Sequence, residues 1–211
     1  MSDNVLAATA CHAPRVAYQG IAGAFGEAAV VQHWHGNARP VAARTFDDAV
    51  TLVVHGDADG AVIPVWNSSI GDVPWGCRAL SERSAAIVIV DHVNLSVQHC
   101  LLARHGTTFD HVRFVGSHPA ALAQCRRFFE ANDRLRACSA SDTAGAAREL
   151  ASMGVPSDTE PWYAHMGTDS PSALAVLASV SAAQRYGLSV LLESVQDDPA
   201  NITRFAVVRR R

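Results

Sequence analysis

The sequence predicts an α/β fold made of two lobes, each with a mostly parallel sheet. Short apolar runs rich in β-branched residues alternate with stretches of helical period, and this alternation occurs in two successive sets. Between the sets lies an apolar stretch that is too long for one ordinary strand. With 49% hydrophobic and 18% charged residues, the chain has the composition of a packed globular protein.

The first set starts at residues 15–20, RVAYQG, where we expect a strand followed by a helix through GEAAVVQHW. PVAAR and FDDAVTLVVH repeat this pattern, and residues 60–65, GAVIPV, add a third strand. The long stretch at 85–104, AAIVIVDHVNLSVQHCLLAR, predicts a pair of strands or one strand that crosses between lobes.

The second set contains VRFVGS at 112–117 with the helix PAALAQCRRFFEA, then RLRACSA with the helix DTAGAARELAS. LAVLAS follows with a helix that ends before Gly187, a residue suited to the left-handed position after a helix. Residues 188–195 and 203–210 are expected to return to the first lobe. The predicted lobes are therefore residues 15–97 with 188–211, and residues 98–187.

Residues 152–171 interrupt the second set. The segment SMGVPSDTEPWYAHMGTDSP has two Gly, three Pro and no helical or strand period, which is typical of a functional lid or a disordered insert. Its Trp162 and Tyr163 could cover the cleft or form a subunit contact. Composition leaves these alternatives open.

Charge and apolar segments exclude several classes of protein. The formal charge of −3 gives no basic field for nucleic acid, and no apolar segment is long enough to span a bilayer. The first residues lack the basic start and apolar core of a signal peptide. We therefore expect a cytoplasmic protein without nucleic-acid or membrane partners.

Cysteine and histidine spacing predicts no metal site. The five cysteines are scattered without CxxC or zinc spacing, so buried free thiols are expected. His33 and His35 are two residues apart, and on a helix such residues point to different faces.

Four turns after predicted strands carry small or polar residues: GIAGAFGE, WNSSIGD, SHPAALAQC and SASDTAGAA. Glycines allow backbone N–H groups to approach an anion, and Ser, Asp and Thr are good helix caps. Because ligands of α/β sheets bind beyond the carboxyl ends of the strands, these turns predict a site for a small, multiply anionic molecule. The GxxGxxG spacing does not match a dinucleotide fingerprint.

Seven motifs follow one another along the chain in this order: YQGIAGAFGEAA, VIPVWNSSIGDV, HCLLA, SHPAALAQC, SDTAGAAR, AQRYGLSVL and DDPANITRF. With these motifs the chain resembles the prephenate dehydratase family over residues 15–208. The resemblance implies a fold like type II periplasmic binding proteins, with the active site in the cleft between lobes. It also implies that prephenate loses its ring hydroxyl and ring carboxylate together, giving phenylpyruvate, carbon dioxide and water without a cofactor.

The resemblance assigns roles to individual residues. Thr203 corresponds to the catalytic threonine and would donate to the departing hydroxyl, and Asn67 and Gln124 are the other expected catalytic residues. Arg204 would either meet a substrate carboxylate or pin the last strand through a salt bridge. The expected substrate-binding residues are Ser68, Arg204, Thr143, Gly23, Ala24, Phe205 and Trp66.

The chain departs from the family pattern at three positions, with Trp66 in place of Glu, Gly26 in place of Ser or Thr, and Ala120 in place of Gln. The regulatory ACT domain that usually follows the TRF motif is not in this sequence. We therefore expect the catalytic module alone, an activity insensitive to phenylalanine, and a homodimer.

Other functions compete with prephenate dehydration. The substrate could be arogenate, in which an amine replaces the side-chain carbonyl. A relative that decarboxylates without dehydrating is disfavoured by the TRF motif, and a non-catalytic binder of small carboxylates is favoured only by Trp66.

Overall fold

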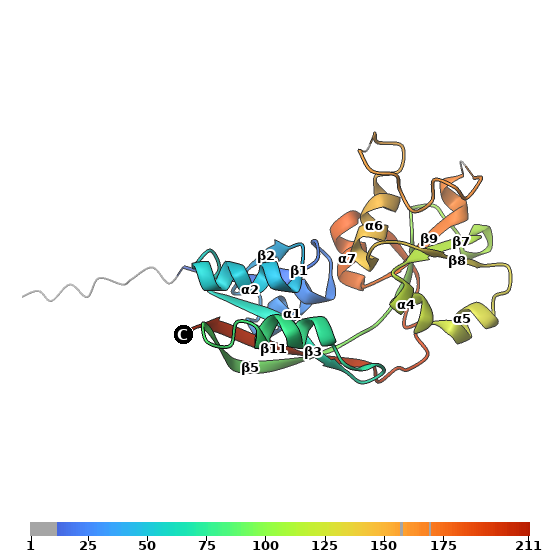
Figure 1. Cartoon of the computed structure of the whole chain (residues 1–211). Coiled ribbons are helices and arrows are strands. Elements are labelled where there is room, and N and C mark those ends of the chain that lie inside the picture. Colours follow the sequence, from blue (N-terminus) through green and yellow to red (C-terminus); the bar gives the residue numbers. More distant parts are fainter. Residues whose placement is uncertain (1–11, 157, 169) are drawn as a thin grey trace, which may run out of the picture.

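The chain folds into two α/β lobes that lie side by side (Figure 1). The computed structural model describes residues 12–156, 158–168 and 170–211. Each lobe has one sheet with helices packed against it, and residues 97–99 and 193–201 connect the lobes. The predicted two-lobed α/β fold is therefore confirmed.

The sheet of the first lobe has the strand order β2-β1-β3-β11-β5, and the short β4 pairs with β3. β1 is parallel to β2 and β3, whereas β11 is antiparallel to β3 and β5. The strands are β1 (Arg15–Gln19), β2 (Arg39–Ala43), β3 (Gly60–Asn67), β4 (Gly71–Asp72), β5 (Ile87–Ser96) and β11 (Ile202–Arg210).

Helices cover both faces of this sheet because neighbouring strand residues point to opposite faces. α1 (Phe25–His33) packs on the face that carries Val62. α2 (Phe46–His55) and α3 (Pro74–Ser81) pack on the face that carries Ile63. Both valine and isoleucine are essentially fully buried, and burial of such a side chain stabilises the fold by roughly 1.5–3 kcal/mol.

Local sequence sets the ends of α2. The Thr45 hydroxyl accepts from the Asp48 N–H, and the Asp48 carboxylate accepts from the Thr45 N–H, which forms a capping box. Gly56 ends the helix with φ of 83°, in the left-handed region that glycine adopts without strain. These signals fix where the helix starts at the cleft side of the sheet.

The sheet of the second lobe has the order β10-β6-β9-β7-β8. β7 is parallel to β8 and β9, and β6 is antiparallel to β9 and β10. The strands are β6 (Cys100–Ala103), β7 (Phe114–Ser117), β8 (Arg136–Ser139), β9 (Leu174–Ala178) and β10 (Ser189–Leu192).

The helices of the second lobe begin at polar or proline residues that the sequence marks. Ser179 caps α7 by accepting from the Ala182 N–H, and Gly187 ends it with φ of 66°, as predicted. The helices are α4 (Pro119–Ala123), α5 (Arg126–Glu130), α6 (Thr143–Ala151) and α7 (Val180–Tyr186), with short 3₁₀ turns η1 (Phe109–His111) and η2 (Pro171–Ala173).

Both sheets are mixed, which corrects the expectation of mostly parallel sheets. Strands of βα units run toward the cleft, so β1, β2 and β3 are parallel. A strand that enters a lobe from a crossing segment runs away from the cleft, which makes β11 antiparallel to its neighbours in the first lobe and β6 antiparallel to β9 in the second.

The second crossing also lies later than expected. β10 pairs with β6, with Val190 opposite Leu102, so the residues from 188 onward belong to the second lobe until Leu192. An apolar run of this length fits the open edge beside β6, and the chain returns to the first lobe only through residues 193–201. The stretch at 85–104 forms two strands, β5 and β6, one in each lobe. Of the two alternatives expected for it, a pair of strands is therefore confirmed.

The described part of the insert at 152–171 packs on the second lobe. The Trp162 indole N–H donates to the Ala146 carbonyl oxygen at 3.3 Å, and the Trp162 backbone N–H donates to the Glu149 carboxylate at 2.9 Å. A Cβ at Gly116 would lie 2.6 Å from the indole, so the ring covers β7 directly. The insert therefore braces α6 and β7 of its own lobe.

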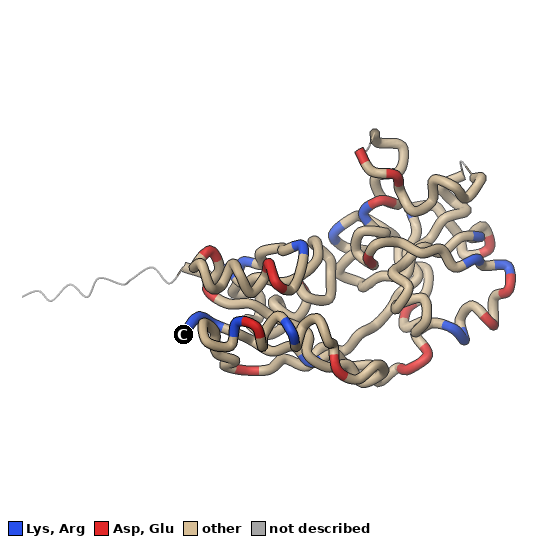
Figure 2. Tube along the Cα trace, in the orientation of Figure 1, with Lys and Arg blue, Asp and Glu red and all other residues tan. Residues whose placement is uncertain are grey.

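Basic and acidic positions are interspersed over both lobes (Figure 2). Within the described residues, every helix is too short or too polar to cross a bilayer.

Candidate active site

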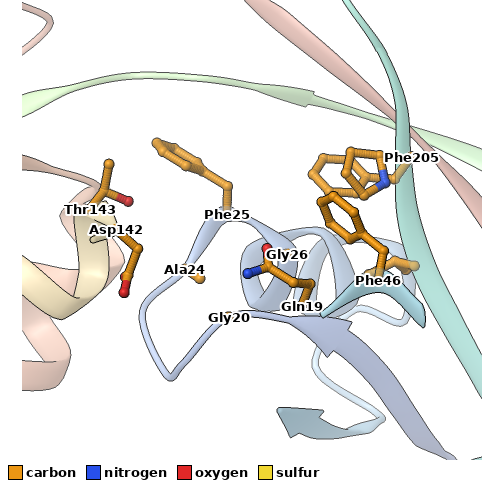
Figure 3. Close-up of a pocket in the computed structure, with 11 residues that line it drawn as sticks. Gln19, Gly20, Ala24, Phe25, Gly26, Phe46, Asp142, Thr143 and Phe205 are labelled. Carbon is orange, nitrogen blue, oxygen red and sulfur yellow. The ribbon is translucent and has the colours of Figure 1, made fainter. Parts of the chain in front are cut away.

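A cavity of about 180 Å³ lies between the lobes, at the carboxyl ends of β1 and the strands beside it (Figure 3). Its walls come from the starts of three helices and from the sheet of the first lobe, and the second lobe contributes only the start of α6. The lining residues are Gln19, Gly20, Ala24, Phe25, Gly26, Phe46, Val62, Pro64, Asp142, Thr143 and Phe205.

The loop at 20–24 brings the two lobes into contact beside this cavity. The Ser179 hydroxyl donates to the Gly23 carbonyl oxygen at 2.8 Å, and the Tyr186 hydroxyl donates to the Ala22 carbonyl oxygen at 2.6 Å. A Cβ on Gly23 would lie 2.9 Å from the Ala182 Cα, and Gly23 has φ of 86°. Only glycine permits this turn and this close approach of the lobes.

Gly23 is not part of the cavity wall. Its N–H donates to the Glu27 carboxylate at 2.6 Å, so the donor that was expected to bind substrate is already paired. Ala24 does line the cavity, at the N-cap of α1. Because Ala24 has no side chain that could cap the helix, Phe25 and Gly26 present an uncapped first turn to the cavity, which favours an anion. The Glu27 carboxylate in the same turn offsets part of this effect and is paired with the Gly23 N–H.

The start of α6 faces α1 across the cavity. Figure 3 shows Asp142 and Thr143 opposite Ala24 and Phe25. The Asp142 carboxylate accepts from the Gly145 N–H at 2.6 Å and so caps α6. Thr143, an expected substrate-binding residue, therefore lies on the cavity wall next to a carboxylate.

Thr203 and Asn67 form the centre of a polar cluster at the paired ends of β11 and β3. They are opposite each other in the register, and the Asn67 Nδ2 donates to the Thr203 Oγ1 at 2.9 Å. Nδ2 also donates to the Asn201 Oδ1 at 2.7 Å. Because the threonine oxygen accepts this bond, its own proton stays available for another acceptor.

Ser68 and Gln124 join this polar cluster through Asn201. The Ser68 hydroxyl lies 3.5 Å from the Asn201 Oδ1, and it accepts from the Ile202 N–H at 2.9 Å. The Asn201 Nδ2 donates to the Gln124 Oε1 at 3.1 Å. Asn67, Ser68, Gln124 and Thr203, which lie far apart in the sequence, are thus connected by a chain of hydrogen bonds across both lobes.

His99 completes the cluster from the first crossing segment. Its Nε2 lies 3.0 Å from the Gln124 Oε1, and a carbonyl oxygen can only accept, so Nε2 carries the proton. Burial lowers the pKa of His99, which keeps the imidazole neutral, and its Nδ1 is buried without a hydrogen bond to any described residue. The ring packs edge-on against Phe25 at 5.5 Å and so connects the cluster with the cavity wall.

Phe205 lies on the cavity wall, whereas Arg204 and Trp66 lie on the other face of the sheet. Thr203 and Phe205 share a face of β11, and Arg204 points to the opposite face. There the Arg204 guanidinium stacks over the Trp66 ring at 5.5 Å, and its Nε donates to the Asn94 Oδ1 at 3.3 Å. The register of β3 shifts at Val65, which turns Trp66 to this outer face.

Arg204 and Trp66 therefore do not join the other expected site residues in this geometry. For Arg204 the structure favours the alternative of a residue that pins the last strand, with an aromatic ring and an amide in place of the expected salt bridge. Trp66 is 37% exposed and is neither a core residue nor a cavity residue.

Sequence reasoning missed several residues of the site, among them Gln19, Phe25, Phe46, His99 and Asn201. His99 and Asn201 both stood within quoted motifs, HCLLA and NITRF, and Phe25 stood within the first one. Their positions in those motifs were a signal, but the pairings of His99 with Gln124 and of Asn201 with Asn67 depend on the way the two crossings meet.

Metal-ligating side chains do not gather in groups of three or more within the described residues. The described cysteines, Cys77, Cys100, Cys125 and Cys138, are free thiols. The polar side chains at the site carry hydroxyl, amide, imidazole and carboxylate groups.

Known proteins resemble the chain over almost its whole length. "Arogenate dehydratase/prephenate dehydratase 2, chloroplastic" of Arabidopsis thaliana is 36% identical over 196 residues, which are 93% of this chain and 46% of the relative. Arogenate dehydratase 2 of Petunia hybrida is 35% identical over 93% of this chain and 45% of its own length. The chain thus spans about half the length of these curated relatives.

Solved structures also match the chain over most of its length. A prephenate dehydratase from Arthrobacter aurescens in complex with L-Phe has a TM-score of 0.75 and 26% identity, over 93% of this chain and 60% of that one. GqqA, described as a novel type of quorum quenching acylase, has a TM-score of 0.77 and 31% identity, over 93% of this chain and 64% of that one. The family model described as prephenate dehydratase matches residues 16–211, and the chain belongs to this family.

Proposed function

We propose that the chain catalyses the decarboxylating dehydration of arogenate or prephenate. The observation that carries this proposal is the Asn67–Thr203 hydrogen bond, on the sheet face from which Phe205 lines the cavity between the lobes. Thr203 and Asn67 themselves lie outside the cavity wall. Membership in the prephenate dehydratase family and identities of about 35% with arogenate dehydratases support it.

In the proposed reaction the Thr203 hydroxyl donates to the ring hydroxyl of the substrate as the carbon–oxygen bond breaks. The Asn67 amide donates to the Thr203 oxygen, so the hydroxyl proton of Thr203 points away from Asn67. The bond between the ring and its carboxylate breaks at the same time, and its electron pair completes the aromatic ring. The hydroxyl leaves with the Thr203 proton as water, the threonine oxygen regains a proton from solvent, the carboxylate leaves as carbon dioxide, and no cofactor is required.

Other groups bind the substrate in this proposal. Phe25, Phe46 and Phe205 supply an apolar wall for the ring. The uncapped first turn of α1 meets a carboxylate. Gln124 and Ser68 hold polar groups beside Thr203, since the Gln124 amide nitrogen has no partner among the described residues.

Purified protein incubated with each substrate tests this proposal. Formation of phenylpyruvate from prephenate or phenylalanine from arogenate, with one carbon dioxide per turnover, is the expected result. Binding of either substrate without turnover would instead favour the non-catalytic binder.

A second candidate function is hydrolysis of an acyl amide, which the 31% identity with the acylase GqqA favours. The three phenylalanines of the cavity wall could also contact an acyl chain. Release of a free amine from N-acyl substrates would support this function, and the same preparation must be assayed with arogenate. Turnover of arogenate without amine release contradicts it.

We also propose that the chain acts as a cytoplasmic homodimer. Dimerisation is supported by the outer edge of β5, where Val88, Ile89 and Val90 are 37%, 47% and 48% exposed. An apolar edge strand with unpaired backbone groups is a ready site for pairing with a second copy. Light scattering of the protein and of Ile89→Lys tests this, with a dimer that dissociates in the variant as the expected result; cell fractionation tests the location.

A further inference from the structure

Asp142 has a position that capping of α6 alone does not explain. Among the described residues, it is the only side chain with a formal charge on the cavity wall, and arginines do not line the cavity. A cavity proposed to bind a molecule with two carboxylates would gain more from a cation at this point. We therefore ask which group of the substrate the Asp142 carboxylate would contact.

The carboxylate has room for a second partner. Capping uses the bond from the Gly145 N–H to the Asp142 Oδ1, and two carboxylate oxygens can together accept about four bonds. Asp142 is partly exposed and sits opposite the uncapped start of α1, the expected place of a substrate carboxylate. An amino acid group fits between these elements, with its carboxylate toward α1 and its ammonium toward Asp142.

The two candidate substrates differ at one group only. Arogenate carries an ammonium where prephenate carries a ketone, so arogenate has one negative charge fewer. An ammonium would donate to Asp142 in a charge-assisted bond, whereas a ketone oxygen is an acceptor and would face another acceptor. Specificity of this kind combines attraction for one ligand with repulsion of the other.

The other charges near Asp142 lie outside the cavity wall. Arg148 and Arg185 act on the nearby Tyr186, but both arginines are exposed and lie outside the cavity wall. Glu27 is close to the same tyrosine, and its carboxylate accepts from the Gly23 N–H at the loop that closes the cavity. Charges of both signs therefore lie near this edge of the cavity, and among the lining residues the charge is that of Asp142.

We propose that Asp142 is the residue that selects arogenate over prephenate, by binding the substrate ammonium. This inference rests on the proposed dehydratase function and names its preferred substrate. It differs from a role for Trp66, which lies on the outer face of the sheet.

The test is Asp142→Asn, because asparagine caps a helix as well as aspartate but carries no charge. The kcat/KM for arogenate divided by that for prephenate should fall by about tenfold to a hundredfold, the range for loss of a hydrogen bond to a charged group. Asp142→Ser, another good cap, provides a second variant if asparagine perturbs folding. Asp110→Asn serves as the control for net charge, since the Asp110 side chain is 94% exposed on the second lobe, and its ratio should not change.

Two outcomes would count against the inference. A ratio that stays constant in both Asp142 variants overturns it, and a constant ratio with an equal fall of kcat/KM for both substrates indicates a structural role of the cap. If the unsubstituted protein turns over neither substrate, the dehydratase function itself is wrong and the inference falls with it.

Discussion

The two faces of the paired strands β3 and β11 carry neighbours from the same motifs, yet their surroundings differ. On one face, Thr203 and Asn67 are hydrogen-bonded to each other, and Phe205 lines the cavity. On the other face, Arg204 stacks on Trp66 at the surface. Residues of one motif on a strand thus belong to the same site only if their side chains lie on the same face of the sheet.

The comparison yields a ranking of effects. Substitutions on the inner face should change the rate, in the order of their closeness to the reacting atoms. Substitutions on the outer face should change stability and leave the rate almost unchanged.

The largest effect is expected for Thr203→Val, which keeps the side-chain shape and removes the donor. The kcat for the preferred substrate should fall by roughly 10²- to 10⁴-fold, the usual range for a positioned acid, and KM should change little because the bond strengthens in the transition state. Thr203→Ser is the matched control and should keep much of the activity. Val equal to or better than Ser would show that the threonine only packs.

Asn67 should have the next largest effect because it acts through Thr203. Asn67→Ala removes the donor to the threonine oxygen and leaves Asn201 without its 2.7 Å bond, so kcat should fall by roughly tenfold to a hundredfold. The free energy of unfolding should also fall by about 1–3 kcal/mol, because Asn67 is 5% exposed.

A double-mutant cycle sharpens this prediction. If Asn67 works by orienting Thr203, the variant with Asn67→Ala and Thr203→Val should be hardly slower than Thr203→Val alone. Full additivity of the two rate effects would contradict a positioning role for Asn67.

The sequence predicted much of the inner face and little of its connections. Asn67, Gln124 and Thr203 were predicted from motifs, and the structure connects all three. Asn201, His99 and Phe25 were missed because their contacts arise where the two crossings and α1 meet, which no local pattern encodes. The outer position of Trp66 depends on the register shift at Val65, and an irregularity of one residue has no clear sequence signal.

The fold shows the same limit. Most strand and helix positions followed from periodicity, and Gly187 was expected after α7. The helix α3 was not predicted, and the single helix expected over PAALAQCRRFFEA is divided into α4 and α5. Strand direction depends instead on the lobe from which a strand enters, so the antiparallel pairing of β11 and the placement of β10 were not predicted.

His99 provides a pH test of the inner face. Burial lowers its pKa in the folded protein from the ordinary value of 6.5, so below about pH 6.5 the unfolded chain binds a proton that the folded chain does not. The free energy of unfolding should therefore fall as the pH drops below 6.5, by at most about 1.4 kcal/mol per pH unit for this one group, until the pH passes the lowered pKa.

Urea unfolding between pH 5 and pH 8 measures this dependence. His99→Gln should reduce the slope below pH 6.5, whereas His92→Gln, which removes an exposed histidine of β5, should keep it. An unchanged slope in His99→Gln would mean that other groups cause the acid sensitivity.

The smallest effect on the rate is expected on the outer face. Arg204→Gln removes the guanidinium from the Trp66 ring and weakens the bond to Asn94, so the free energy of unfolding should fall by about 0.5–1 kcal/mol, the range for an exposed cation–π contact. Because both side chains lie on the face of the sheet opposite to Thr203 and Phe205, kcat/KM for either substrate should stay within about threefold. Trp66→Glu should likewise leave the ratio of the two substrates constant, although a carboxylate there could pair with Arg204 and offset part of the lost contact. A drop of kcat/KM by more than tenfold in Arg204→Gln, with stability unchanged, would mean that the guanidinium reaches the substrate in a conformation of the lobes other than this one, and the division between the two faces would then be wrong.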